Sequence, residues 1–202
     1  MNIVLATRNR KKIEEIKKIM SETFSGTDIK ILTPDDFPQC LEVEEDGKTF
    51  EANAVKKAVY ISKCTGMTAI ADDSGLEVYA LNGAPGVFSA RYAGESANDS
   101  ANCEKLLYEM RGLPDERRKA RFACCIAVAS GDDVKTFLGY AEGKIGTEPI
   151  GDKGFGYDPL FYPEGHSRTF AEMSDDEKNA LSHRGKALAE LQKYLKEEGL
   201  IR

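Results

Sequence analysis

Arg-Phe-Ala-Cys-Cys-Ile-Ala-Val-Ala-Ser, residues 121–130, is a long apolar run that ends directly at Gly131-Asp132-Asp133. Apolar runs bounded by turn residues are typical of buried strands, and a Gly-Asp turn between two such runs is typical of a β-hairpin. The sequence therefore predicts a hairpin in which residues 121–130 pair with residues 134–142.

The first third of the chain alternates between strand and helix patterns. Residues 3–6 and 28–33 are apolar runs that predict strands, and apolar positions between 13 and 20 recur at helical spacing. A second helix is expected over 49–64 with Thr49 as its cap, followed by a strand over 67–71. Early alternation and later antiparallel pairing predict an α/β fold with a mixed sheet flanked by helices.

The last third of the chain predicts a long C-terminal helix. Ser174 and Glu177 form a capping box, and the helix that it opens is expected to run to about residue 198. Residues 98–110 predict a further short helix. No repeat or linker divides the sequence, so we expect a single domain over 1–202.

The charge balance excludes some partners. The chain carries 28 Lys and Arg against 34 Asp and Glu, a formal net charge of -6, which argues against duplex nucleic acid as the main partner. The N-terminus lacks a charged leader, and no apolar run approaches membrane-spanning length. We expect a soluble cytoplasmic protein with no membrane partner.

The five cysteines, Cys40, Cys64, Cys103, Cys124 and Cys125, contain no C-x-x-C pair. An odd count suits a reducing compartment better than a disulfide framework. We expect these residues to be small apolar side chains in or near the core.

Residues 71–75, Ala-Asp-Asp-Ser-Gly, place two carboxylates and a hydroxyl where the expected strand ends. Crowded carboxylates repel each other unless a cation lies between them and the substrate, which favours a Mg²⁺ site. All four polar or glycine residues also favour turns, so a plain turn is the alternative.

The segment after the first strand contains Thr7, Arg8, Asn9, Arg10, Lys11 and Lys12. Backbone N–H groups at a helix start, polar side chains and clustered cations form a site for phosphate oxygens. The segment lacks the Walker pattern. The alternative is a capped helix with solvated basic residues, although cations are disfavoured in a first turn and here call for an anionic partner.

An acidic segment, which includes Glu44 and Glu45, precedes the second helix. It is either a solvated loop or the second anchor of a Mg²⁺ ion that keeps most of its waters. Asn53 and Lys57 are four residues apart, so they share a face of the expected helix, whereas Lys56 points elsewhere.

Two later segments suit recognition of a base. Glycines flank Phe155 in 151–159, which allows the ring to lie flat for stacking, although a core Phe in a glycine-rich loop explains it equally well. Lys178 and Ser182 lie about one turn apart on the expected last helix, with His183 and Arg184 nearer its flank. These side chains either offer donors to a base carbonyl or are ordinary surface residues.

Five motifs, taken in chain order, resemble those of the inosine triphosphate pyrophosphatase family. They are Thr7 to Lys12, Ala71 to Leu76, Gly83-Ala84-Pro85-Gly86 with Ser89-Ala90-Arg91-Tyr92, Gly154 to Pro159, and Ser182-His183-Arg184. The resemblance covers essentially the whole chain. It implies an elongated two-lobed α/β fold around a long mixed sheet, usually in a homodimer.

The resemblance also implies an activity: Mg²⁺-dependent hydrolysis of ITP, dITP and XTP between the α and β phosphates. Thr7 to Lys12 would bind the triphosphate, with Lys57 helping to neutralise its charge, and Asn53 is assigned to the same centre. Asp73 would be the general base or a metal ligand, and Ser74 would touch the substrate. Glu45, or its neighbour Glu44, matches the acidic metal position, and Arg8 departs from the smaller residue that relatives often carry.

The same resemblance assigns the base and sugar to Phe155, Gly156, Tyr157, Asp158, Lys178, His183 and Arg184. Donors from His183 or Arg184 would suit the 6-carbonyl of hypoxanthine and xanthine and leave adenine unmatched. Two other functions stay open: a related pyrophosphatase for pyrimidine or methylated nucleotides, and a nucleotide-binding module without catalysis.

Overall fold

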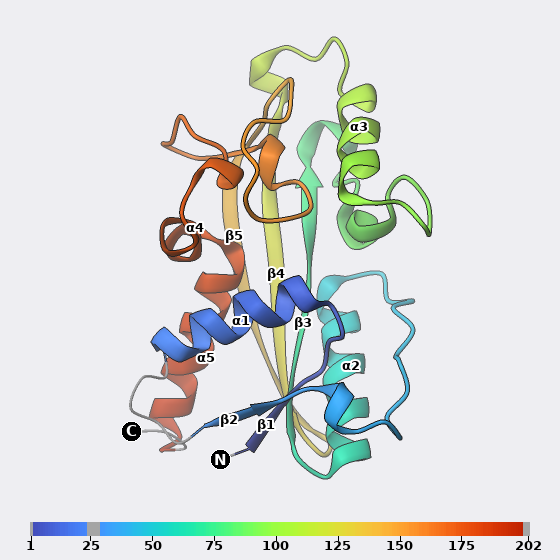
Figure 1. Ribbon diagram of the computed structural model, residues 1–202, viewed down its shortest axis with the longest axis vertical. Coiled ribbons are helices and arrows are strands. Elements are labelled where there is room, and N and C mark those ends of the chain that lie inside the picture. Colours follow the sequence, from blue (N-terminus) through green and yellow to red (C-terminus); the bar gives the residue numbers. More distant parts are fainter. Residues whose placement is uncertain (1, 24–28, 200–202) are drawn as a thin grey trace. The chain divides into compact units, whose positions relative to one another are not determined.

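The computed structural model describes residues 2–23 and 29–199, and its strands form a sheet of order β2-β1-β3-β4-β5-β6 (Figure 1). The strands are β1 (Asn2–Leu5), β2 (Lys30–Leu32), β3 (Thr68–Val78), β4 (Lys119–Ser130), β5 (Asp133–Ile145) and β6 (Phe161–Pro163). β1 pairs in parallel with β2 and β3, whereas β5 pairs antiparallel with β6. The α/β class with a mixed sheet flanked by helices is confirmed. Asp28, the first residue of the predicted second strand, lies outside the described residues.

The helices are α1 (Arg10–Thr23), α2 (Phe50–Thr65), α3 (Asp99–Glu109), α4 (Asp175–Leu181) and α5 (His183–Glu197). α2 begins as predicted, because the Thr49 hydroxyl accepts a hydrogen bond from the backbone N–H of Ala52. α3 is capped in the same way by Asn98, which accepts from Ala101. In the described part of the chain, none of the helices has the length and apolar character needed to cross a membrane.

The residues divide into two compact units. Unit 1 comprises Met1–Asp73, Cys124–Gly139 and Arg184–Arg202, and unit 2 comprises Ser74–Ala123 and Tyr140–His183. The strands β3, β4 and β5 therefore contribute residues to both units. That residues 1–202 form a single functional domain stays a prediction.

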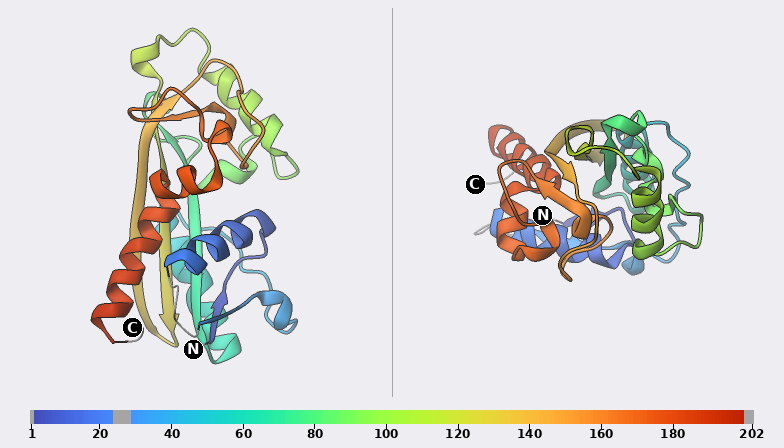
Figure 2. Two further views of the ribbon diagram at one scale, coloured as in Figure 1. Left: turned by 60° about the vertical axis from the view of Figure 1, so that its left-hand side comes forward. Right: turned by 90° about the horizontal axis from the view of Figure 1, so that it is seen from above.

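Unit 1 places alternate strand residues in two separate cores. One core contains Ile3, Leu5, Ile70 and Ile126 of the strands with apolar residues of α1 and α5, and the other contains Val4, Ala69, Ala71 and Cys125 with Ala54, Ala58 and Ile61 of α2. This follows from the period of two along a strand, which sends neighbouring side chains to opposite faces. Figure 1 shows α1 and α5 on one face and α2 on the other, and Figure 2 shows α5 running beside β5.

Unit 2 has its own apolar core. Leu76 and Val78 of β3 pack there with Leu106 and Met110 of α3. The rings of Phe122, Phe161 and Phe170 gather in the same core, with centroid separations of 4.8, 6.0 and 5.0 Å. Each unit thus buries its own set of apolar side chains.

The predicted hairpin is confirmed, but the prediction that the third strand ends at Ala71 is wrong. β4 and β5 are neighbours in the sheet, and the turn between them contains Gly131 at φ 64°. β3 continues through Asp72 and Asp73 to Val78, so these residues form no turn. The strand continues because both carboxylates find partners on their own faces of the sheet, which removes the cost of burying them.

The prediction of one continuous C-terminal helix is also wrong. Ser182 has an extended backbone, with φ -70° and ψ 154°, and it separates α4 from α5. Its N–H still bonds to the carbonyl of Lys178, while its hydroxyl lies 3.5 Å from the carbonyl of Asn179. Serine competes for backbone hydrogen bonds in this way, so Lys178 and Ser182 do not share one helix face.

The cysteine prediction is wrong for two of the five residues. Cys40 and Cys64 form a disulfide, with their Cα atoms 5.9 Å apart. The irregular segment between β2 and α2 brings Cys40 to the C-terminal end of α2, a proximity that a sequence separation of 24 residues does not reveal. Cys103, Cys124 and Cys125 are free and buried, as predicted.

Candidate active site

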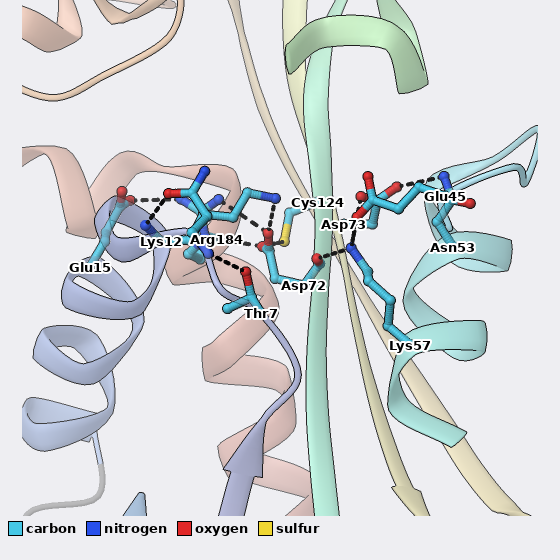
Figure 3. Close-up of polar contacts among 11 residues, drawn as sticks. Thr7, Lys12, Glu15, Glu45, Asn53, Lys57, Asp72, Asp73, Cys124 and Arg184 are labelled. Carbon is cyan, nitrogen blue, oxygen red and sulfur yellow. Dashed lines mark hydrogen bonds and ion pairs between the residues drawn. The ribbon is translucent and has the colours of Figure 1, made fainter. Parts of the chain in front are cut away.

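Asp72 and Asp73 point to opposite faces of β3 (Figure 3). Asp72 follows Ile70 by two residues and faces α1 and α5, whereas Asp73 follows Ala71 by two residues and faces α2. The period of two along a strand dictates this arrangement. Unit 1 therefore holds one polar cluster on each side of the same strand.

On the first face, the Asp72 carboxylate is fully buried and surrounded by donors. The Lys12 Nζ lies 2.5 Å from Oδ1, and Oδ2 accepts hydrogen bonds from Arg184 Nε and Cys124 Sγ, both at 3.0 Å. Burial by itself would raise the pKa of Asp72, but Arg184 and Lys12 outweigh it and hold that pKa well below its usual range. Asp72 is therefore ionised at neutral pH.

On the second face, two carboxylates share one ammonium. Lys57 Nζ lies 3.1 Å from Asp73 Oδ1 and 2.5 Å from Glu45 Oε1, and it also donates to the backbone carbonyl of Asp72. Burial raises the pKa of Asp73, and Glu45 adds to this rise while Lys57 and Lys12 oppose it. Burial would lower the pKa of Lys57, but Asp73 and Glu45 overcome it and raise that pKa.

The helix α2 positions Asn53 and Lys57 as the four-residue spacing predicted. Asn53 Nδ2 donates to Asp73 Oδ2 at 3.1 Å, and its Oδ1 accepts from the N–H of Gly47 at 2.7 Å. A Cβ at position 47 would lie 2.5 Å from that Oδ1, so glycine is needed for the close approach. Lys56 points away, as expected, and pairs with Asp46 at 2.7 Å.

The segment from Thr7 to Lys12 forms the start of α1. Asn9 Oδ1 accepts from the N–H of Lys12 at 3.2 Å, and no acidic residue lies in the first turn. Arg10 and Lys11 are exposed, and Thr7 Oγ1 accepts from the N–H of Asn9. Arg8 turns to Asp35 and to the carbonyl of Cys40, at 2.9 and 3.0 Å. The helix start thus combines backbone donors with cations, which suits phosphate oxygens.

The second face also fits a hard cation. Asp73 and Glu45 present two carboxylates against the single charge of Lys57, which leaves an excess of negative charge. Mg²⁺ is commonly bound by one or two carboxylates while it keeps several waters. Glu44 is exposed, and the described residues hold no group of three or more His, Cys, Asp or Glu side chains arranged to enclose a metal.

In unit 2, Asp158 links Phe155 to Lys178. Asp158 Oδ2 accepts from the N–H of Phe155 and from Lys178 Nζ, both at 2.8 Å. The Lys178 ammonium lies 4.9 Å from the centroid of the Phe155 ring. Gly154 has φ 71°, and a Cβ there would lie 2.1 Å from Asp158 Oδ2, so only glycine permits this contact.

The remaining predicted residues of unit 2 are largely packed inside it. Tyr157 is buried and donates to the carbonyl of Ser89 at 2.8 Å, and the carbonyl of Gly156 accepts from the Cys103 thiol at 3.4 Å. His183 is 4% exposed, and its ring stacks on Phe122 with centroids 4.8 Å apart. Ser74 is half-buried on β3.

Comparisons with known proteins find relatives over nearly the whole chain. The model of the Ham1 family matches residues 3–194. The chain belongs to the Ham1 family. It is 53% identical to a Desulfotalea psychrophila protein named dITP/XTP pyrophosphatase over 94% of this chain and 82% of that protein. It is 50% identical to a Geobacter sulfurreducens protein of the same name, over 98% of both chains.

Solved structures show the same fold for this Ham1-family chain. A HAM1 protein from Coxiella burnetii has a TM-score of 0.88 and 44% identity, covering 98% of this chain and 99% of that one. The names of the relatives and the structural match confirm the resemblance that the five motifs carried.

Sequence reasoning missed parts of the cluster on the first face. Arg184 stays assigned to the base, and its guanidinium also contacts Asp72 and Glu15, the latter at 3.0 Å from Nη1, which the sequence did not predict. Cys124 was assigned to the core, and its thiol donates to Asp72. Glu15 follows Lys12 by three residues on α1, a spacing that could have indicated a shared face. No pattern in this Ham1-family sequence indicates the Cys124 contact.

Proposed function

We propose that this chain hydrolyses dITP, XTP and ITP between the α and β phosphates, releasing a nucleoside monophosphate and pyrophosphate. The observation that carries the proposal is that Asp73 of β3, which shares Lys57 with Glu45, also lies near enough to Lys12 for that cation to lower its pKa. Carboxylates and phosphate-binding cations are thus held within one unit. Ham1-family relatives carry the name dITP/XTP pyrophosphatase, which supports the dITP and XTP part of this proposal.

The chain's own residues account for the chemistry as follows. The first turn of α1 and Lys12 bind phosphate oxygens and offset the charge that would repel an attacking water. Asp73 either orients that water and accepts its proton or holds the cation that activates it, while Asn53 and Lys57 fix the carboxylate by the contacts described above. The raised pKa of Asp73 brings its basicity closer to that of a useful general base.

We also propose Mg²⁺ as the cofactor, held by Asp73 and Glu45, with Glu44 as the alternative to Glu45. When bound, the ion would neutralise phosphate charge and polarise the reacting phosphoryl group. The excess of negative charge around Lys57 supports this assignment.

For the base, the proposal rests on unit 2. The ring of Phe155 offers a stacking face, and Lys178 and His183 are donors suited to a 6-carbonyl. Adenine would oppose a donor with its own amino group, a mismatch that can reduce turnover by several orders of magnitude. Gly156, Tyr157, Asp158, Arg184 and Ser74 remain assigned to binding of base and sugar.

Further features follow from the family resemblance. We propose a cytoplasmic homodimer that acts on free nucleotides and not on nucleic acid. Light scattering of the purified protein tests the assembly, because a dimer has twice the mass of the chain.

The deciding experiment measures pyrophosphate release from dITP, XTP, ITP, dATP, GTP and dTTP, with Mg²⁺ and with a chelator. The expected result is Mg²⁺-dependent release from the first three, by the wild type and not by D73N prepared in parallel. A preference for dTTP would contradict the base assignment, and tight binding without release would contradict hydrolysis.

A further inference from the structure

The disulfide between Cys40 and Cys64 ties the acidic segment, residues 37–49, to the C-terminal end of α2. All residues of this segment are described, and they form neither helix nor strand. A segment without regular secondary structure depends on contacts at a few points for its path. The bond at Cys40 is one of these points.

The far end of the acidic segment carries Glu45 to the second face of β3. Glu45 Oε1 lies 2.5 Å from Lys57 Nζ, which also contacts Asp73 (Figure 3). Glu45 follows Cys40 by only a few residues, and an extended chain spans at most about 3.5 Å per residue. The bond at Cys40 therefore limits how far Glu45 can move from Lys57 and Asp73.

The near end of the acidic segment contacts the residues expected to bind phosphate. Arg8 Nη2 donates to the carbonyl of Cys40 at 3.0 Å, and Arg8 Nη1 donates to Asp35 at 2.9 Å. A shift of Cys40 would thus remove a contact that orients Arg8. The same bond fixes residues on both sides of the proposed site, the carboxylate of Glu45 and the start of α1.

The hydrogen bonds around Cys40 lie near the surface. The N–H of Leu41 donates to the Tyr60 hydroxyl at 3.0 Å, and these two residues are 70% and 36% exposed. The side chain of Arg8 is 38% exposed. Water competes for hydrogen bonds at such positions, so each contributes little. We therefore expect the covalent bond to be the main constraint on this part of the segment.

The two sulfur atoms belong to residues that differ in access. Cys40 is fully buried, whereas Cys64, in the last turn of α2, is half-buried. The thiolate of a dithiol that attacks Cys64 Sγ breaks the S–S bond, forms a mixed disulfide with Cys64 and releases Cys40 as a thiolate, which takes up a proton. The second thiol of the dithiol then displaces Cys64 and closes the reagent's own disulfide. Two electrons pass from the dithiol to the pair, and the protein gains two thiols.

We propose that Cys40–Cys64 is a thiol–disulfide exchange site through which a dithiol loosens the acidic segment and so weakens the hold of Glu45 on Mg²⁺. The proposal rests on the proposed function, which supplies the cation and a reducing compartment. In such a compartment a protein disulfide is typically transient or redox-sensing. The oxidised protein is the form that binds the cation tightly, and the reduced protein binds it weakly.

The test compares oxidised full-length protein with protein reduced by dithiothreitol and then freed of the reagent. A Glu-specific protease reports the acidic segment, because Glu42 and Glu44 are exposed. Electron paramagnetic resonance counts bound Mn²⁺, which suits the same carboxylate and water ligands as Mg²⁺. Reduction is expected to speed cleavage within the segment severalfold and to raise the Kd for Mn²⁺ about tenfold, the effect of losing support behind a metal ligand. Oxidised glutathione should reverse both changes.

C40S/C64S is the matched control. It keeps the free thiols of Cys103, Cys124 and Cys125, so dithiothreitol should change neither quantity, and its Kd for Mn²⁺ should equal that of the reduced wild type. E45Q keeps the decision possible if this variant does not fold. Reduction of E45Q should still speed cleavage of the segment but should no longer change the Kd for Mn²⁺.

Unchanged cleavage and Mn²⁺ binding would overturn the proposal once alkylation and mass spectrometry show that both cysteines are reduced. Burial of the Cys40 side chain would then hold the segment without the bond. A pair that stays oxidised in the folded protein under excess dithiothreitol would overturn it as well.

The two proposals fail in different ways. A wild-type protein that hydrolyses none of the nucleotides contradicts the proposed function. Cleavage and Mn²⁺ binding need no turnover, so they still decide the role of the bond. Active wild-type protein whose Mn²⁺ affinity is the same in both redox states contradicts the exchange site alone.

Discussion

Asp72 and Asp73 are adjacent on β3, yet their surroundings shift the pKa values of their carboxyl groups in opposite directions. Burial raises the pKa of Asp73, whereas Arg184 and Lys12 overcome burial and lower that of Asp72. The difference arises because Asp72 has two cationic partners, while Asp73 shares Lys57 with Glu45. Neighbouring carboxyl groups with pKa values pushed apart are suited to different tasks: Asp72 as a fixed counterion and Asp73 as a proton acceptor.

Replacing Asp73 with Asn should abolish turnover while the fold is kept. The amide is isosteric and can still accept from Lys57, but it neither takes a proton nor binds a cation as a carboxylate does. We expect a loss of at least about 100-fold in kcat for dITP, the range of general-base removal. Pyrophosphate release measures it, and a rate close to that of the wild type would remove Asp73 from the chemistry.

The stability of D73N supplies a second check. A carboxyl group whose folded-state pKa is raised above its unfolded value lowers stability when it is ionised. In D73N the amide NH2 would face the Asn53 Nδ2 donor, a cost that offsets the gain from removing a carboxylate of raised pKa, so the Tm should stay close to that of the wild type at neutral pH in metal-free buffer. A clearly lower Tm would mean that the lost activity reports damage to the fold.

Replacing Asp72 with Asn should lower stability, unlike D73N. Removing one member of a buried ion-pair network leaves the partner charges uncompensated and costs about 3–5 kcal/mol of unfolding free energy. Asp133→Asn is the matched control, because Asp133 is exposed at the start of β5, and a change there should stay within about 0.5 kcal/mol.

The pH dependence of this stability difference has a definite sign. The folded-state pKa of Asp72 lies well below the reference value of 3.8. Its contribution is therefore complete above that value and is lost as the pH falls through the folded-state pKa. Chemical denaturation of wild type and D72N should give a constant difference down to about that reference pH and a shrinking one below it. A difference already shrinking near neutrality would contradict the ion-paired state of Asp72.

Local sequence patterns predicted much of the fold and part of the site. The hairpin follows from turn chemistry at Gly131, and the cap of α2 follows from Thr49. Asn53 and Lys57 were expected on one face of a helix, and both contact Asp73. These relationships lie within one or two elements, where spacing alone determines which side chains are neighbours.

Long-range contacts escaped the same reasoning. Asp72 and Arg184 are 112 residues apart, and only the packing of α5 against the sheet brings them together. The continuation of β3 through two aspartates depends on those distant partners. The turn preference of the local sequence therefore led to the wrong prediction that the strand ends at Ala71. Ser182 breaks the last helix without a glycine or proline to signal it.

Replacing Gly154 with Ala tests the unit 2 cluster. The new Cβ would lie 2.1 Å from Asp158 Oδ2, so the carboxylate must leave Phe155 or Lys178. We expect KM for dITP to rise at least about tenfold, which corresponds to about 1.4 kcal/mol. Gly165→Ala is the control, because Gly165 also has positive φ, 78°, but nothing within 4 Å of its Cβ position. Equal effects of the two substitutions would mean that backbone strain alone is responsible.

Replacing Cys40 or Cys64 with Ser should lower stability to the same degree. A disulfide restricts the unfolded chain, and its removal costs typically about 2–4 kcal/mol. If the bond is the cause, C40S, C64S and the double variant have the same Tm. Dithiothreitol then lowers the Tm of the wild type toward that value and leaves the Tm of each variant unchanged. If the two thiols instead stabilised the fold separately through apolar packing, the drops in Tm of the single variants would add in the double variant. The segment from Cys40 carries Glu45 to Lys57, so the variants should also need a higher Mg²⁺ concentration for half-maximal rate.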